Sequence, residues 1–241
     1  MKKFIFVLFL GAFCFSTLAK TILFGTEATY APFEYYNEQN QLTGFDIEIA
    51  KLVCEVSQLN CEFKNQSFDS LIPSLKTRRI DAAIAAIDIT DARREQVLFT
   101  HAYYNNTAVF LAQKGAFTAL DSLKSKRIGV QNGTTHQKYL MRNYPFMQLV
   151  PYDSYQYAIL DLKSGRIDAI FSDAAVGSHW VTVEKNLAIV GKRITDPDYF
   201  GAGFAIAVRQ GNGRLVGKFN EALTKIHADG RYKKIHDRWF K

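Results

Sequence analysis

Short apolar runs alternate along the chain with segments of helical periodicity. Residues 22–25 and 126–130 are mostly apolar, are followed by turn residues, and are predicted to be strands. A sequence resembling a capping box, followed by apolar positions on one helical face, predicts a helix over residues 43–56. The same periodicity predicts a helix over residues 215–226, which residues 229–230 end. Strands that alternate with helices are typical of α/β folds with parallel sheets.

One segment of the sequence occurs twice. Residues 75–82, LKTRRIDA, recur as residues 162–169, LKSGRIDA. Each copy predicts a helix end, a tight turn and a buried strand, which place Ala86 and Asp173 at matching positions. Two copies so far apart do not indicate a solenoid. They predict two similar α/β lobes, each with a mostly parallel sheet flanked by helices.

No linker rich in proline, glycine or serine separates the halves of the chain. We expect two strand-like crossings, residues 105–112 and 195–204. The first lobe would then comprise residues 20–106 and 201–241, and the second lobe residues 107–200. Ligands of open α/β sheets bind beyond the carboxyl ends of strands, and clefts between lobes are favoured sites. Candidate ligand residues are therefore those that follow the predicted strands.

The first nineteen residues have the features of a secretory signal peptide. Lys2 and Lys3 precede an apolar run of about a dozen residues, and Thr17 and Ala19 are small residues that fit cleavage after Ala19. The run is shorter than the roughly 20 residues that span a bilayer core. The mature chain is therefore expected to be exported to the periplasm.

Composition excludes several protein classes. With 48% apolar and 22% charged residues, the 241-residue chain is neither disordered nor of low complexity. Basic residues outnumber acidic ones by 30 to 23, but no basic tract is interleaved with aromatics, so no nucleic-acid partner is expected. Without the leader, two of the three cysteines remain, Cys54 and Cys61, either as a disulfide or as two buried thiols. We expect a monomer that holds no metal and no cofactor.

The loop after the first predicted strand carries Glu27 and Tyr30. Glu27 offers a carboxylate that can accept two parallel bonds from a guanidinium, and Tyr30 offers a flat face to a cation. Phe68 is a candidate for the opposite wall. The alternatives are a solvated loop acid for Glu27 and core rings for Tyr30 and Phe68.

Residues 88–94 predict an anion site. Thr90 is a candidate N-cap, so Arg93 and Arg94 fall in the first helical turn, where the helix dipole disfavours cations. An anion bound jointly by the helix N-terminus and one arginine would explain their position. The alternative is two solvated arginines stabilised by Glu95.

A strand, a glycine turn and a capped helix over residues 129–136 predict a second anion site. The glycine patterns of the dinucleotide-binding fold and of the P-loop are absent. The candidate ligand residues here are Gln131, Thr134, Thr135 and His136, the last of which is alternatively a surface histidine. Asp173 ends an apolar strand, where a carboxylate needs a partner, unless it caps the next helix.

Together these groups suit an L-amino acid. Arg93, with the amides near Asp88 and Thr135, would take the α-carboxylate. Asp88 and Asp173 would take the α-ammonium, and Glu27 is left for the side chain. Three acids against one arginine give a local charge of −2, which a cationic ligand neutralises and a neutral ligand leaves uncompensated. The aromatic walls and the bidentate acid favour planar arginine over lysine.

Five motifs carry a family resemblance across essentially the whole mature chain. They are residues 25–33, 44–46, 68–75, 89–93 and 129–135. In this order they resemble the periplasmic amino-acid-binding proteins of ATP-driven importers, also called solute-binding protein family 3. Residues 130–138 and 150–155 are most similar to its arginine-binding branch, which is close to the lysine/arginine/ornithine-binding proteins.

The resemblance implies the type II periplasmic-binding-protein fold, with the ligand in the interlobe cleft, and a disulfide between Cys54 and Cys61. Carried over by motif, the ligand contacts would be Arg93 and Thr135 for the carboxylate, Asp173 for the ammonium, Tyr30 and Phe68 for the side-chain walls, and Glu27 for the guanidinium. Asp88, Glu27 and the pair Ala85-Ala86 stand where broad-specificity relatives carry Ser, Asp and two serines. These departures count against binding of lysine and ornithine.

The resulting prediction is a receptor that binds L-arginine by lobe closure and delivers it to the membrane permease of an ABC importer, with lysine and ornithine as candidate secondary ligands. The alternative is a periplasmic dehydratase on the same fold, with His101, His136 and the carboxylates as acid–base groups. The sequence contains no nucleophile–base pair or metal-ligand spacing that favours an enzyme, so no catalytic residues are expected.

Overall fold

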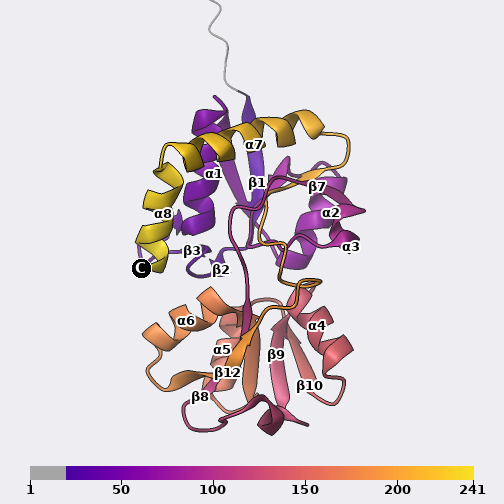
Figure 1. Cartoon of the computed structure of the whole chain (residues 1–241), viewed down its shortest axis with the longest axis vertical. Coiled ribbons are helices and arrows are strands. Elements are labelled where there is room, and N and C mark those ends of the chain that lie inside the picture. Colours follow the sequence, from indigo (N-terminus) through magenta and orange to yellow (C-terminus); the bar gives the residue numbers. More distant parts are fainter. Residues whose placement is uncertain (1–19) are drawn as a thin grey trace, which may run out of the picture.

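The computed structural model describes residues 20–241, and the predicted signal peptide lies outside the described residues. Two groups of helices pack around two separate sheets, and extended segments cross between them (Figure 1). The helices of the first lobe are α1 (Phe45–Val56), α2 (Leu71–Lys76), α3 (Asp91–Arg94), α7 (Gly213–Ala228) and α8 (Arg231–Phe240). Those of the second are α4 (Thr135–Asn143), α5 (Tyr155–Lys163) and α6 (Ala174–Val183). Among residues 20–241, no helix is both long and apolar enough to cross a membrane.

The two main sheets share one plan. The first has the order β5 (Asn60–Asn65), β1 (Thr21–Thr26), β6 (Ala82–Ala83), β13 (Ala207–Arg209), β7 (Val97–Phe99). The second has the order β10 (Gln148–Tyr152), β9 (Arg127–Gln131), β11 (Ala169–Asp173), β8 (Ala108–Gln113), β12 (Leu187–Ile194). A small third sheet contains β2 (Thr29–Tyr30), β3 (Glu34–Tyr36) and β4 (Leu42–Thr43).

Four of the five strands in each main sheet point the same way, as the mostly parallel prediction requires. Only β13 and β8 pair antiparallel with both neighbours. Each of these strands follows a crossing segment, so the chain enters it from the cleft and runs away from it. The other four strands of each main sheet run toward the cleft. Their carboxyl ends therefore place the candidate ligand residues at the cleft.

The repeated sequence has a repeated structure. Asp81 bonds the strand beside it twice, through its N–H to Leu23 O at 2.8 Å and through its carboxylate to Leu23 N–H at 3.0 Å. Asp168 does the same with Arg127, at 2.8 Å for both bonds. The aspartate of each copy therefore holds the start of its strand to the parallel strand beside it, β1 in the first lobe and β9 in the second. The predicted helix end, turn and strand are confirmed in both copies.

Helix α1 begins without the predicted capping box. Its N-cap is Gly44, and no side chain caps the helix. Asp46, the expected cap partner, is fully buried and accepts hydrogen bonds from Ala86 N–H and Tyr103 Oη, both at 2.7 Å. Tertiary partners thus replace the local capping interaction that the sequence pattern predicted.

Two predicted strands are shorter or absent. β6 ends at Ala83, whereas the apolar run predicted a strand to residue 87, because the backbone turns at Ala86 with a φ of 47°. Residues 195–204 form a turn in which the Asp196 carbonyl accepts the N–H groups of Tyr199 and Phe200. Pro197 in this segment has no N–H to donate to a strand.

Apolar packing and a disulfide stabilise the first lobe. The predicted helix near the C-terminus is α7, whose buried face is Leu215, Phe219, Ala222, Leu223 and Ile226. Cys54 of α1 and Cys61 of β5 form a disulfide with a Cα–Cα distance of 6.1 Å. The alternative of two separate thiols is therefore excluded.

Candidate functional site

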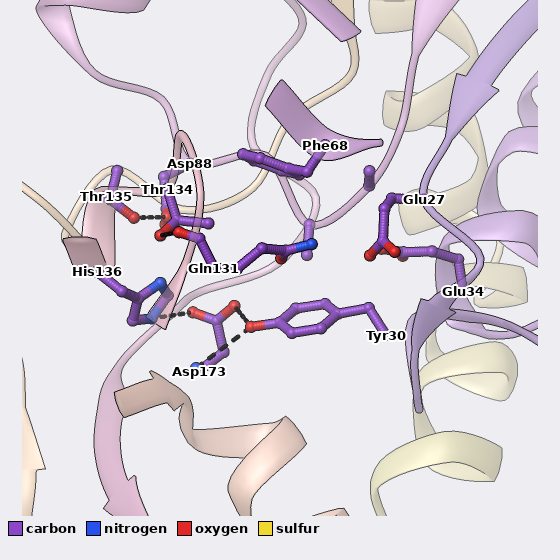
Figure 2. Close-up of a pocket in the computed structure, with 12 residues that line it drawn as sticks. Glu27, Tyr30, Glu34, Phe68, Asp88, Gln131, Thr134, Thr135, His136 and Asp173 are labelled. Carbon is purple, nitrogen blue, oxygen red and sulfur yellow. Dashed lines mark hydrogen bonds and ion pairs between the residues drawn. The ribbon is translucent and has the colours of Figure 1, made fainter. Parts of the chain in front are cut away.

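The structure brings the predicted ligand residues into one pocket between the lobes (Figure 2). Its lining residues are Glu27, Tyr30, Glu34, Phe68, Ala85, Ala86, Asp88, Gln131, Thr134, Thr135, His136 and Asp173. All predicted ligand residues are in this set except Arg93. Glu34 is the residue that the sequence reasoning missed altogether.

Strand ends and one helix start position these side chains. On the first lobe, Glu27 follows β1 and Tyr30 ends β2. On the second lobe, Gln131 ends β9 and Asp173 ends β11. Thr134, predicted from the glycine turn, caps α4 by accepting the N–H of residue 137 at 3.2 Å. The polar groups of both lobes therefore meet at the carboxyl edges of the two sheets.

Asp173 is buried at one end of the pocket, where Tyr30 Oη and Asn106 Nδ2 donate to its carboxylate. His136 Nε2 lies 3.1 Å from Asp173 Oδ1, and its ring packs against Phe171 and Phe200. Asp173 occupies the N-cap position of α6, as the alternative expected, but its side chain makes no capping hydrogen bond to that helix. His136 is 2% exposed, which excludes a surface histidine.

Asp88 lies beside Asp173 and belongs to the other lobe. Thr135 Oγ1 donates to Asp88 Oδ2 at 2.6 Å, and Asn106 Nδ2 donates to Asp88 Oδ1 at 2.9 Å. Burial and the negative charge of Asp173 raise the pKa of Asp88, while His136 and Arg93 lower it. Two carboxylates from different lobes therefore converge at this end of the pocket, where one cation can contact both.

Glu27 lies at the opposite end of the pocket and is not a solvated loop acid. Its side chain is 4% exposed and accepts a hydrogen bond from Thr29 Oγ1. Burial raises the pKa of Glu27 to about 7, although hydrogen bonds with Thr29 and Gln131 act in the other direction. A carboxylate that pays this desolvation cost would be stabilised by a cationic partner.

Glu34 lies next to Glu27 and is 1% exposed (Figure 2). Among residues 20–241, neither of its carboxyl oxygens has a hydrogen-bond partner of good geometry. Burial, with the nearby charges of Asp46 and Glu27, raises the pKa of Glu34 well above its usual range. A side-chain hydrogen bond with Asp46 also raises the pKa of Glu34. In the sequence, the position of Glu34 between the aromatic residues Phe33 and Tyr35 could have indicated a buried acid. A buried acid on the pocket wall whose neighbours are themselves acids would be stabilised by a ligand that supplies donors.

Aromatic rings lie between the two acidic ends. In Figure 2, Phe68 and Tyr30 lie on either side of Gln131, whose amide points toward Glu27. Tyr30 also stacks on Tyr155 of α5, with the centroids 5.2 Å apart and the planes at 29°. The pocket therefore has acids at both ends and flat apolar walls between them.

Arg93 lies behind the pocket wall. Thr90 Oγ1 accepts Arg93 N–H at 3.3 Å, which confirms the predicted N-cap. The guanidinium lies over the ring of Phe68 at 5.3 Å and donates to Asp88 O at 2.8 Å and to Gly133 O at 3.2 Å. Arg93 is 4% exposed, so it is not a solvated arginine, and Arg94 is the exposed member of the pair. Within the described part of the chain, these bonds use two of its five N–H groups.

Metal binding has no support from this site. Within residues 20–241, no group of three or more His, Cys, Asp and Glu side chains is arranged to hold a metal ion. The four acids are instead divided into two pairs, with Asp88 and Asp173 at one end of the pocket and Glu27 and Glu34 at the other.

Residues 22–241 match the model of the bacterial extracellular solute-binding proteins, family 3. The chain belongs to this family. This family 3 protein is 52% identical to the putative ABC transporter arginine-binding protein 2 of Escherichia coli K12, over 100% of this chain and 99% of the relative. It is 49% identical to ABC transporter arginine-binding protein 1 of the same organism, with the same coverage.

A solved periplasmic binding protein from Salmonella typhimurium, described as having high arginine specificity, superimposes on this family 3 protein with a TM-score of 0.90. The two are 44% identical, and the alignment covers 92% of this chain and 100% of that one. The predicted two-lobed type II fold is thereby confirmed. These relatives are binding proteins and not enzymes, which leaves the dehydratase alternative without support.

Proposed function

We propose that this protein binds L-arginine in the cleft between its lobes and delivers it to the membrane permease of an ABC importer in the periplasm. The observation that carries the proposal is the pair of buried acids, Glu27 and Glu34, at the end of the pocket opposite Asp88 and Asp173. An amino acid with a cationic side chain places one positive group at each end. The names of its relatives support arginine in particular.

The proposed contacts follow from the placement of each group. Asp173 and Asp88 bind the α-ammonium, while the backbone N–H of Thr135 at the start of α4 and the guanidinium of Arg93 bind the α-carboxylate. A planar guanidinium takes the place of the Gln131 amide between Phe68 and Tyr30 and donates to Glu27 and Glu34. Lysine and ornithine carry compact ammonium groups that cannot make bidentate bonds with both acids, so they bind more weakly.

Closure of two lobes over the ligand is part of the same proposal. The first lobe comprises residues 20–106 and 201–241, the second residues 107–200, and a leader is cleaved after Ala19. A permease then recognises the closed form.

Isothermal titration calorimetry of unfolded and refolded, ligand-free protein tests the proposal. The ligands are arginine, lysine, ornithine, histidine, glutamine and citrulline, the last of which has the shape of arginine without its charge. Arginine is expected to bind most tightly, and citrulline at least about 100-fold more weakly, which corresponds to about 2.7 kcal/mol. Glutamine or citrulline binding as tightly as arginine would contradict the proposal.

A further inference from the structure

Asn106 lies in the crossing segment between the lobes and contacts both of them. It is 6% exposed, precedes β8, and stands between Asp88 of the first lobe and Asp173 of the second. In the sequence it is only the middle residue of the triplet Asn105-Asn106-Thr107, and no binding motif includes it.

The side-chain amide of Asn106 joins the two carboxylates. Nδ2 donates to Asp88 Oδ1 at 2.9 Å and to Asp173 Oδ1 through a shorter bond. An amide nitrogen carries two N–H groups, so these bonds use all of its donors. The opposite orientation would point the carbonyl oxygen at two acceptors and is excluded.

The two carboxylates need such a donor because they are buried and alike in charge. The charge of Asp173 raises the pKa of Asp88, and among residues 20–241 no lysine lines this pocket. Their remaining side-chain partners are separate. Thr135 bonds Asp88, while Tyr30 bonds Asp173 and His136 Nε2 lies 3.1 Å from Asp173 Oδ1. Asn106 is the single side chain among the described residues that bonds both.

We propose that Asn106 is a positioning residue that sets the spacing of Asp88 and Asp173 so that one α-ammonium contacts both. This inference rests on the proposed binding of a basic amino acid. Because Asn106 belongs to the crossing segment, the same contact ties the amino-group subsite to the relative position of the lobes. The selectivity for the α-amino group thus depends on a residue outside both sheets.

The test compares arginine with 5-guanidinopentanoate, which has the same guanidinium and carboxylate but no α-amino group. Affinities of the wild type and of Asn106→Ala are measured by calorimetry. We expect the substitution to weaken arginine by about 10- to 100-fold, because two charged acceptors lose a donor. The affinity for 5-guanidinopentanoate is expected to change less than about threefold.

Asn105→Ala is the matched control, since Asn105 is the exposed neighbour in the same segment and should bind both ligands as the wild type does. Asn106→Ser retains one hydroxyl donor and is expected to lose less arginine affinity than Asn106→Ala. It replaces the alanine variant in the test if that variant does not fold. Equal weakening of both ligands, or unchanged arginine binding, would overturn the assignment.

Failure of the proposed function is distinguishable from failure of this inference. If wild-type protein prefers ornithine to arginine, the arginine proposal is wrong. The comparison is then made with ornithine and 5-aminopentanoate, and the same loss confined to the ligand with an α-amino group would support the role of Asn106.

Discussion

Thr135 of the second lobe donates a 2.6 Å hydrogen bond to Asp88 of the first. The hydroxyl comes from the first turn of α4, and the carboxylate from the loop after β6. The bond therefore links the orientation of Asp88, a candidate ligand residue, to the distance between the lobes. A change that separates the lobes would break this bond and leave Asn106 as the side-chain donor to Asp88 among the described residues.

Thr135→Val removes this hydroxyl and keeps the shape of the side chain. We expect arginine affinity to fall by about tenfold, since a buried carboxylate loses a hydrogen-bond donor. Thr182→Val, at an exposed position on α6, is the control and should bind as the wild type does. Calorimetric titration measures both, and equal effects would show that the cross-lobe bond is not used in binding.

Arg93→Lys keeps the charge but not the planar group that reaches across the cleft. A lysine ammonium has three donors, so bonds to the carbonyls of Asp88 and Gly133 would leave it one donor and no planar pair of N–H groups for a carboxylate. We expect at least about a 100-fold loss of affinity for every amino acid tested. Arg94→Lys, at the exposed neighbouring position, should leave binding unchanged. A loss confined to arginine would contradict the assignment of Arg93 to the carboxylate common to all ligands.

Glu34→Gln tests whether the second buried acid takes part in recognising the side chain. The variant keeps the shape and loses the charge, so arginine is expected to bind about 10- to 100-fold more weakly while citrulline changes little. Glu62→Gln on the exposed side of β5 is the control. If arginine and citrulline weaken together, Glu34 acts through the fold and not through the guanidinium.

The buried acids also predict how stability depends on pH in the ligand-free protein. The pKa is about 7 for Glu27 and about 6 for Asp46, and is raised well above the usual range for Glu34. Acids with a higher pKa in the folded state bind more protons folded than unfolded between about pH 4 and pH 7. The free energy of unfolding therefore falls as the pH rises through this window, by about 3 kcal/mol for Glu27 alone.

Urea unfolding at pH 5 and pH 8 measures this difference. Glu27→Gln removes one titrating group, so the drop in unfolding free energy between the two pH values should become smaller. Saturating arginine is expected to reduce the drop as well, because the cation stabilises the ionised carboxylates. Greater stability of the ligand-free protein at pH 8 than at pH 5 would contradict the burial of these acids.

Much of the fold follows from local sequence. The periodicity of residues 215–226 predicts α7, and Thr90 and Thr134 cap the helices that they were expected to cap. The repeat predicts two related lobes, since a helix end, a turn and a buried strand each depend on neighbours in the chain. The pattern fails at residues 43–46, where Asp46 bonds Ala86 and Tyr103 instead of its own helix.

The sequence alone determined the elements, the two-lobed arrangement and most members of the pocket, because these depend on short-range patterns and family motifs. Only the tertiary structure decided that Glu34 is buried beside Glu27, that Arg93 reaches across the cleft, and that Asn106 joins two carboxylates. Burial and partnership depend on residues brought together from distant parts of the chain, as Tyr30 and Asp173 are across 143 positions. No local pattern of charge or periodicity encodes such contacts.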